Sequence, residues 1–220
     1  MIVKDRSLIE QAQRGKFPNV KCLYSTIPRE MRQHMFRVSK YANVLFEEAL
    51  KEGLRDLSLP KDIKDYSEEI FRYHDIGRCY IPADILNKVE ELTEEEKTEI
   101  KKHTLYALYA EKSVYFPFLP EHIVPYFRQV AVFHHEWYNG NGYPYGRKGK
   151  QIPFMARVCA IADAFDGMVS WKTYKESMTC EEAFETLREL SGTQFQPELV
   201  ECFIRCKSEI IEIHRKLEME

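Results

Sequence analysis

The chain has 220 residues, of which 44% are hydrophobic and 30% are charged, and its formal net charge is −3. These values are typical of a globular protein with one large or two small domains, and they argue against a protein that coats a nucleic-acid polymer. No apolar run approaches the roughly 20 residues of a membrane span, and the polar N-terminus does not resemble a signal peptide. We therefore expect a cytoplasmic protein, with no membrane partner and with six reduced cysteines.

Helical periodicity runs through nearly the whole chain. Apolar residues recur at helical spacing after Pro28, which suits a first turn, and stop before Gly53, which suits a helix end. Further helices are expected over residues 67–74, 93–114, 121–137, 154–170, from 179, and over 197–217. The glycine-rich stretch 138–151 is expected to be a loop.

This pattern predicts an all-α fold, a single helical-bundle domain with one irregular loop. We expect residues 1–27 to form an N-terminal helical extension and residues 28–220 to form the domain.

Polar residues recur where such a bundle would turn them inward. Five of the seven histidines do so: His34, His74, His103, His134 and His135. Each has an ordinary explanation when taken alone; His34, for example, could hydrogen-bond to Glu30 one helical turn earlier. Asp163 is harder to explain, because an unpaired carboxylate in so apolar a helix is costly. Asp166 and Lys172 are candidate partners for it.

A shared metal site would explain these inward polar residues together. Helical bundles build metal sites from inward-facing residues on several helices. Imidazole and carboxylate ligands without cysteine favour iron, manganese, zinc, cobalt or nickel over calcium. Seven or eight ligands are too many for one ion, so we expect two or three divalent metal ions that share a bridging carboxylate.

The order of the motifs resembles the HD-GYP family, a branch of the HD-domain metal-dependent phosphohydrolases. The motifs are HDIGR at 74–78, KKHT around His103, HHEWYNGNGYP at 134–144 and ADAFDGMVSWKTYK at 162–175. The resemblance covers about residues 28–205. It implies an all-helical fold, a centre of two or three ions, often iron or manganese, and hydrolysis of a cyclic dinucleotide, chiefly cyclic di-GMP. A hydroxide shared by the metals would open it to a linear dinucleotide or to mononucleotides.

The resemblance also implies a role for individual residues. Four match the ligands of one ion: His34, His74, Asp75 and Asp163. Three match the ligands of the second ion: His103, His134 and His135. Asp75 would also be the bridge, Arg78 would neutralise charge on the phosphate, and Glu30 would help to hold a third ion. Four match the substrate-contacting region: Tyr143, Pro144, Lys172 and Lys175.

The chain departs from the family pattern at three positions. Arg78 stands where the family usually has lysine, Asn139 where it has aspartate, and Lys172 where it has arginine. Arginine at position 78 keeps the charge but is a planar donor that does not deprotonate, and lysine at position 172 loses bidentate phosphate recognition. The changes at 78 and 172 bear on the substrate rather than on the metal ligands.

Two other functions stay open. One is an HD-type nucleotidase or phosphatase that acts on linear nucleotides; the HHE…GYP loop argues against it. The other is a non-catalytic module that binds a cyclic dinucleotide or a partner protein; the complete set of ligands argues against that. The sequence has no recognisable sensor domain, so we expect regulation by a separate sensor or regulator protein.

Overall fold

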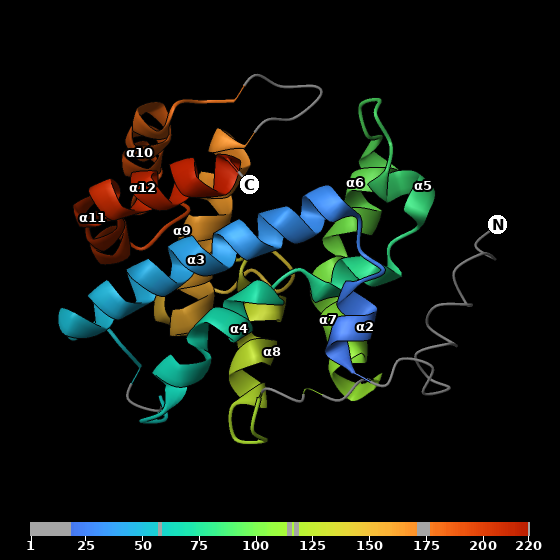
Figure 1. Cartoon of the computed structure of the whole chain (residues 1–220), viewed down its shortest axis with the longest axis horizontal. Coiled ribbons are helices and arrows are strands. Elements are labelled where there is room, and N and C mark those ends of the chain that lie inside the picture. The colour runs from blue at the N-terminus through green and yellow to red at the C-terminus, as the bar shows by residue number, and fades with distance from the viewer. Residues whose placement is uncertain (1–18, 57–58, 114–115, 117–118, 171–176, 220) are drawn as a thin grey trace.

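The regular secondary structure of the described chain is helical (Figure 1). The computed structural model describes residues 19–56, 59–113, 116, 119–170 and 177–219. The α-helices within these ranges are α2 (Val20–Tyr24), α3 (Arg29–Lys51), α4 (Ser67–Arg72), α5 (Ala83–Leu86), α6 (Glu94–Lys101), α7 (His103–Ser113), α8 (Val124–Phe133), α9 (Phe154–Val169), α10 (Cys180–Glu189), α11 (Pro197–Arg205) and α12 (Lys207–Glu218). The 3-10 helices are η1 (Ile63–Tyr66), η2 (Ile76–Tyr80) and η3 (Gly149–Gln151). The predicted all-α fold is confirmed, and none of the described helices is both long and apolar enough to cross a bilayer.

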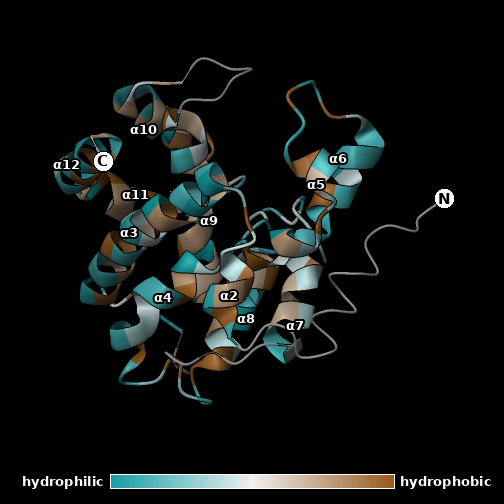
Figure 2. Cartoon of the chain, turned by 45° about the vertical axis from the view of Figure 1, so that its right-hand side comes forward, coloured by the Kyte–Doolittle hydropathy of each residue, from teal (hydrophilic) through white to brown (hydrophobic). Residues whose placement is uncertain are grey.

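Helix α3 is the element around which much of the bundle packs. It contacts α4, α9, α11 and α12, and it buries an apolar stripe that includes Val38 and Leu45. In Figure 1 it crosses the front of the molecule, and in Figure 2 it carries both teal and brown turns, as a helix with one buried face should. It starts after Pro28 and is closed by Gly53 at a φ of 74°, as the sequence predicts.

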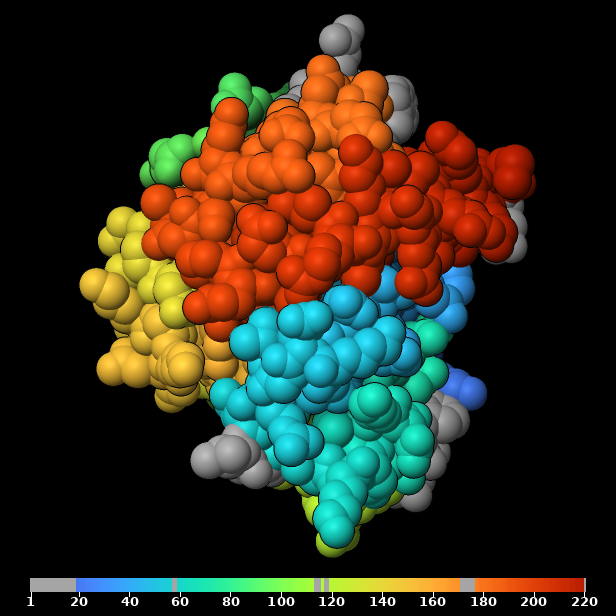
Figure 3. All heavy atoms as spheres, turned by 90° about the vertical axis from the view of Figure 1, so that its left-hand side faces the viewer, coloured from blue at the N-terminus to red at the C-terminus, as the bar shows by residue number. Residues whose placement is uncertain are grey.

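Helix α9 is the most deeply buried helix of the site region. The ring of Phe165 lies 5.1 to 5.4 Å from the rings of Tyr41, Phe184 and Phe203, distances typical of favourable aromatic pairs. These contacts tie α9 to α3, α10 and α11. Figure 3 shows the outer surface of this region, where the orange and red C-terminal helices lie beside the cyan part of the chain at the end of α3. The core thus fixes α3 and α9 against each other.

Two long predicted helices are wrong in one respect, because each is divided. The helix expected over 93–114 is interrupted at Lys102, between α6 and α7, although its predicted capping box at Thr93 is present. The side chains of His103 and Thr104 bond to carbonyl groups three residues earlier, which competes with continuation of the helix. The helix expected over 197–217 is divided at Cys206, whose N–H donates to the carbonyl groups of Cys202 and Phe203.

Helix α8 is shorter than the expected 121–137, and its early end puts two site residues, His134 and His135, at the helix terminus. The helix ends at Phe133, so His134 is its C-cap and His135 lies in the turn that follows. The N–H of Glu136 donates to the carbonyl group of Phe133, which bends the chain away from the helix axis. Helix α2 lies within the expected helical extension, whereas α5 and the 3-10 helices were not predicted. Most of the expected extension 1–27 lies outside the described residues, so that domain division stays a prediction.

Helix α7 and η2 approach each other closely at Gly77. A Cβ atom at this position would lie 2.0 Å from the carbonyl oxygen of His103 and 2.7 Å from the backbone nitrogen of Ala107. Only glycine allows this approach, which sets His103 beside the segment that carries His74 and Asp75.

We expect Gly77→Ala to lower the free energy of unfolding by about 1–3 kcal/mol, because the new methyl group must push the two backbones apart. Chemical denaturation measures this change. Gly53→Asn is the matched control, since no atom lies within 4 Å of an added Cβ there and asparagine tolerates a positive φ. An unfolding midpoint for Gly77→Ala equal to that of Gly53→Asn would contradict the close approach.

Candidate metal centre

Separate segments of the chain bring the predicted site residues to one place. His74 and Asp75 lie in the turn between α4 and η2, and both are fully buried. His103 is the first residue of α7, His134 is the C-cap of α8, and His135 lies in the turn that follows. Helices α3 and α9 add His34 and Asp163 from the opposite side. Residues far apart in sequence therefore meet within the bundle.

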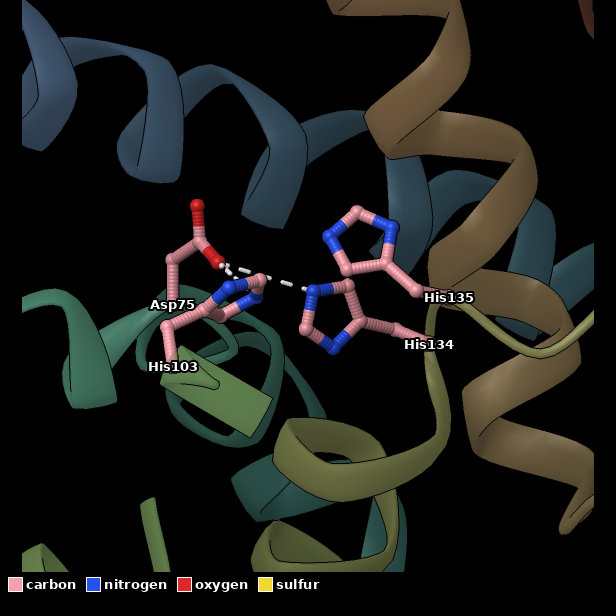
Figure 4. A group of neighbouring side chains, drawn as sticks. All are labelled: Asp75, His103, His134 and His135. Atoms are coloured by element: carbon pink, nitrogen blue, oxygen red, sulfur yellow. Dashed lines mark ion pairs between the residues drawn. The ribbon is translucent and has the colours of Figure 1, made fainter. Parts of the chain in front are cut away.

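The side chains form two groups. Within each group, the potential ligand atoms lie within 4.8 Å of one another. We call the first the Asp75 group; its members are Asp75, His103, His134 and His135. We call the second the His34 group; its members are His34, His74 and Asp163. Figure 4 shows the Asp75 group, with Asp75 and His103 on one side and the two adjacent histidines on the other. The groups divide the histidines in the same way as the family resemblance does.

Asp75 connects the two groups. Its Oδ1 lies 3.0 Å from Nε2 of His103 and 3.5 Å from Nε2 of His134 (dashed lines in Figure 4). Its Oδ2 faces the other way, 3.8 Å from Nε2 of His74, and accepts a hydrogen bond from Nε of Arg78. A carboxylate with one oxygen toward each group has the geometry of a bridging ligand.

Asp163 also spans both groups. Its Oδ1 lies 3.1 Å from Nε2 of His34 and 3.8 Å from Nε2 of His74. Its Oδ2 lies 3.8 Å from Nδ1 of His135 in the Asp75 group. The carboxylate in an apolar helix that the sequence could not explain is therefore surrounded by imidazole rings.

Three histidines are held in one tautomer by the backbone. The Nδ1–H groups of His74, His103 and His134 donate over 2.7 to 3.0 Å to carbonyl groups of the preceding helical turn. Burial lowers the pKa of His74 to about 4 and also lowers the pKa of His103, so these two rings are neutral. Each of the three directs Nε2 into the centre, and in His74 and His103 this nitrogen is unprotonated, the form that binds a metal.

Four buried polar atoms of the centre have no hydrogen-bond partner within the described chain. They are Oδ1 of Asp75 and Nε2 of His74, His103 and His134, and all are buried. The contact of 3.0 Å between His103 and Asp75 thus joins two acceptors, which repel each other unless a positive charge lies between them. Divalent cations would satisfy all four atoms, so the residues fit the predicted metals.

The carboxylates are ionised. Burial raises the pKa of Asp75, but Arg78 and the surrounding histidines hold it well below its usual value. Burial likewise raises the pKa of Asp163, but the hydrogen bond from His34 and the nearby His135 outweigh it. His34 differs from the other rings: burial lowers its pKa, while hydrogen bonds to Asp163 and Asp166 raise it to about 10. A cation at His34 would therefore have to replace the proton on Nε2.

A cavity of about 610 Å³ opens beside the His34 group. Its lining includes His34 and Asp163 of that group and the guanidinium groups of Arg37 and Arg78. Glu30 also lines the cavity, but it belongs to neither ligand group. A substrate in this cavity would lie against the metal site and beside Arg78.

The remaining predicted residues are placed unevenly. The ring of Tyr143 stacks on His135 with 4.8 Å between ring centroids, so Tyr143 adjoins the Asp75 group. Pro144 follows it through a cis peptide bond. Lys172 and Lys175 lie outside the described residues, so their expected role stays a prediction.

The hydrogen-bond partner of His34 was not predicted from the sequence. The bond to Glu30, which was the ordinary explanation for His34 taken alone, is not formed, because Nδ1 of His34 lies 2.7 Å from Oδ2 of Asp166. Asp166 also accepts two hydrogen bonds from Arg37. The signal was present in the spacing: Arg37 follows His34, and Asp166 follows Asp163, by three residues on a helix.

Glu136 has a different role from the histidines before it. It is buried and belongs to neither ligand group. Its carboxylate accepts hydrogen bonds from the backbone N–H groups of Tyr145 and Arg147, at 2.8 and 2.9 Å. Glu136 thereby fastens the glycine-rich loop beneath the histidines.

Comparison with known proteins gives relatives over most of this chain. The HD domain model matches residues 37–199. A probable cyclic di-GMP phosphodiesterase from Vibrio cholerae is 33% identical over 88% of this chain and 44% of its own length. A cyclic di-GMP phosphodiesterase from Thermotoga maritima is 38% identical over 65% of this chain and 38% of its own length. The chain thus spans less than half the length of these relatives.

A solved structure shares the fold. It is an HDG"Y"P protein from Bdellovibrio bacteriovorus, with a TM-score of 0.54, 18% identity, and coverage of 77% of this chain and 50% of that chain. At this identity the likeness concerns the arrangement of the helices alone.

We expect divalent cations such as Mn²⁺ to stabilise the fold, because they bind the native arrangement of orphaned acceptors and not the unfolded chain. At a free ion concentration of roughly 100 times Kd, each site adds about 2.7 kcal/mol to the free energy of unfolding. Denaturation with Mn²⁺ and with a chelator measures the difference. His103→Ala should reduce it, whereas His122→Ala, which alters an exposed pair with Asp62, should not. Equal stability with and without Mn²⁺ would contradict a metal centre.

Proposed function

This chain belongs to the HD domain family, and on that premise we propose that it is a metal-dependent phosphodiesterase that hydrolyses a cyclic dinucleotide. The substrate we favour is cyclic di-GMP, with a linear dinucleotide or mononucleotides as products. The names of the relatives from Vibrio cholerae and Thermotoga maritima support this substrate class. The HD-GYP resemblance in the motifs at 74–78 and 134–144 supports the same reaction.

One observation carries the proposal: Asp75 is buried between two groups of imidazole ligands and turns one oxygen toward each. Two divalent ions held there would supply Lewis acidity and an activated water nucleophile. Asp75 would fix the separation of the two positions, and Asp163 would do so from the opposite side. The histidines would keep the positions in place, because backbone carbonyl groups hold three of the rings.

Arg78 is placed to meet the scissile phosphate. Its side chain is 19% exposed, donates from Nε to Oδ2 of Asp75, and lines the cavity beside the His34 group. The terminal nitrogens of the guanidinium would neutralise the charge that grows on the phosphate oxygens during in-line displacement. The lysine usual in the family would bring one compact charge, whereas Arg78 can hold Asp75 and a phosphate at once.

Tyr143 would contact the substrate from the loop side. Burial raises its pKa, so the hydroxyl group stays protonated and can donate to a phosphate oxygen, or the ring can pack against a base. Pro144 would shape the same wall. We assign the second phosphate to Lys172 and Lys175, on the resemblance alone.

For the metals we propose iron or manganese, with zinc, nickel and cobalt as other ions that imidazole and carboxylate ligands accept. Glu30, exposed at the rim of the cavity, would assist a third ion. We also propose a cytoplasmic location, supported by six free cysteines, and control by a separate sensor or regulator protein.

Product analysis tests the proposed reaction. Protein loaded with Mn²⁺ or Fe²⁺ under anaerobic conditions would be incubated with cyclic di-GMP, mixed cyclic GMP-AMP, cyclic di-AMP and linear nucleotides, and the products followed by mass. We expect one cyclic dinucleotide to be opened. Asp75→Ala should abolish metal loading and turnover together.

Other outcomes would redirect the assignment. Cleavage of linear nucleotides alone would make the protein a nucleotidase. No turnover by protein shown to carry its metals would indicate a binding module. Full activity in Asp75→Ala would contradict the two-ion scheme.

Arg78 gives a second test of the mechanism. Arg78→Ala should lower kcat by about 10²- to 10³-fold, the usual effect of removing one donor to transition-state charge, and Arg78→Lys should lie between it and the wild type. Arg128→Ala is the control, because Arg128 pairs with Glu111 at the surface. Steady-state kinetics with the cleaved dinucleotide measures the effect, and an unchanged kcat for Arg78→Ala would remove Arg78 from the reaction.

A further inference from the structure

We propose that Asp166, clamped by Arg37, is the positioning residue for His34, and that the ion of the His34 group depends on it while the ion of the Asp75 group does not. This inference rests on the metal centre of the proposed function and assigns a role to two residues that bind no metal themselves. We call Asp166 and Arg37 the clamp.

In the clamp, Asp166 is buried, Arg37 is half-buried, and a network of hydrogen bonds joins them. Nε of Arg37 donates to Oδ1 of Asp166 over 2.7 Å, and Nη2 donates to Oδ2 over 2.9 Å. Nη2 also donates to the hydroxyl group of Ser170 over 2.8 Å. The side chain of Asp166 is only 1% exposed, so solvent does not compete for the carboxylate. A bidentate pair of this kind fixes the orientation of both partners.

The clamp sets the orientation of His34. Oδ2 of Asp166 accepts the Nδ1–H of His34 over 2.7 Å. With Nδ1 committed to this bond, the ring turns Nε2 toward Oδ1 of Asp163, 3.1 Å away. A carboxylate behind a ligating imidazole fixes its tautomer and strengthens it as a ligand.

His34 is alone in this arrangement among the five histidines of the centre. His74, His103 and His134 bond through Nδ1 to backbone carbonyl groups, which no side-chain substitution removes. His135 turns Nδ1 toward the centre and stacks its ring on Tyr143. Among these five histidines, His34 is therefore the one whose Nδ1–H is held by the side chain of a residue outside both ligand groups.

Helix geometry explains why the clamp belongs to this position. His34 and Arg37 lie three residues apart on α3, and Asp163 and Asp166 lie three residues apart on α9. Each helix thus presents two neighbouring side chains to the other. His34 and Asp163 face the metal centre, and Arg37 and Asp166 lie directly behind them.

Metal binding without substrate tests the proposal. Asp166→Asn keeps the shape of the side chain but loses its charge. We expect it to weaken one of two Mn²⁺ sites by about 10- to 100-fold and to leave the other unchanged. Calorimetric titration and metal analysis after dialysis give affinity and stoichiometry. The electron paramagnetic resonance of Mn²⁺ gives a separate signature, since coupled ions should be replaced by an isolated ion.

Control variants separate positioning from general damage. Asp56→Asn makes the same chemical change in another aspartate that pairs with an arginine of α9, Arg157, and should keep both ions. Arg37→Gln leaves Asp166 in place but unclamped, and should weaken the same site by a smaller factor. Circular dichroism checks that each variant folds.

A further pair of variants locates the weakened site. His103→Ala alone should retain the ion of the His34 group. His103→Ala combined with Asp166→Asn should retain neither ion under conditions in which each single variant holds one.

The outcomes distinguish this role from the proposed reaction. Two ions bound with wild-type affinity by both Asp166→Asn and Arg37→Gln would overturn the clamp and leave the phosphodiesterase untouched. Equal weakening of both sites in folded Asp166→Asn would overturn it as well. Selective loss of one ion from a protein that cleaves no cyclic dinucleotide would support the clamp and contradict the reaction.

Discussion

The buried carboxylate of Asp75 is the constraint on which the site depends. It lies among imidazole rings that turn unprotonated nitrogen atoms toward it, and a solvent-free arrangement of facing acceptors is unfavourable. Arg78 compensates only Oδ2 of Asp75, to which its Nε donates a hydrogen bond. The other oxygen faces His103 and His134 and requires a cation. The metal centre thus follows from the burial and orientation of a few polar atoms.

The helical scaffold keeps those atoms in place by means that do not involve the metals. Gly77 lets η2 lie against α7, which sets Asp75 beside His103. Glu136 fastens the loop after His135 by accepting two backbone N–H groups. Aromatic packing around Phe165 holds α9 against α3. Much of the site's geometry is therefore carried by residues that would never touch substrate.

The sequence predicted the elements whose signals are local. Helix α3 has a regular apolar stripe between Pro28 and Gly53, and the capping box at Thr93 marks a helix start. The interruptions at Lys102 and Cys206 were not predicted. Apolar periodicity continues through both positions, and it carries no information about the hydrogen bonds that divide the helices there.

The candidate site was likewise predicted only in part. The motif order placed the histidines in two sets, and the structure brings each set together. The partners of His34 were missed, because Asp166 and Arg37 lie 129 residues apart and only the packing of α3 on α9 joins them. Glu136 directly follows the two histidines in sequence, yet its carboxylate turns toward the loop. Local spacing identifies ligand types, whereas long-range packing decides which groups support them.

Anomalous diffraction from crystals of the Mn²⁺-loaded protein would test whether Asp75 lies between two ions. We expect two strong anomalous peaks, one on each side of Asp75: one near Nε2 of His103 and His134, the other near Asp163 and Nε2 of His34. A single peak on one side of Asp75, or peaks at sites away from both of its oxygens, would contradict the assignment of Asp75 as the bridge between two ions.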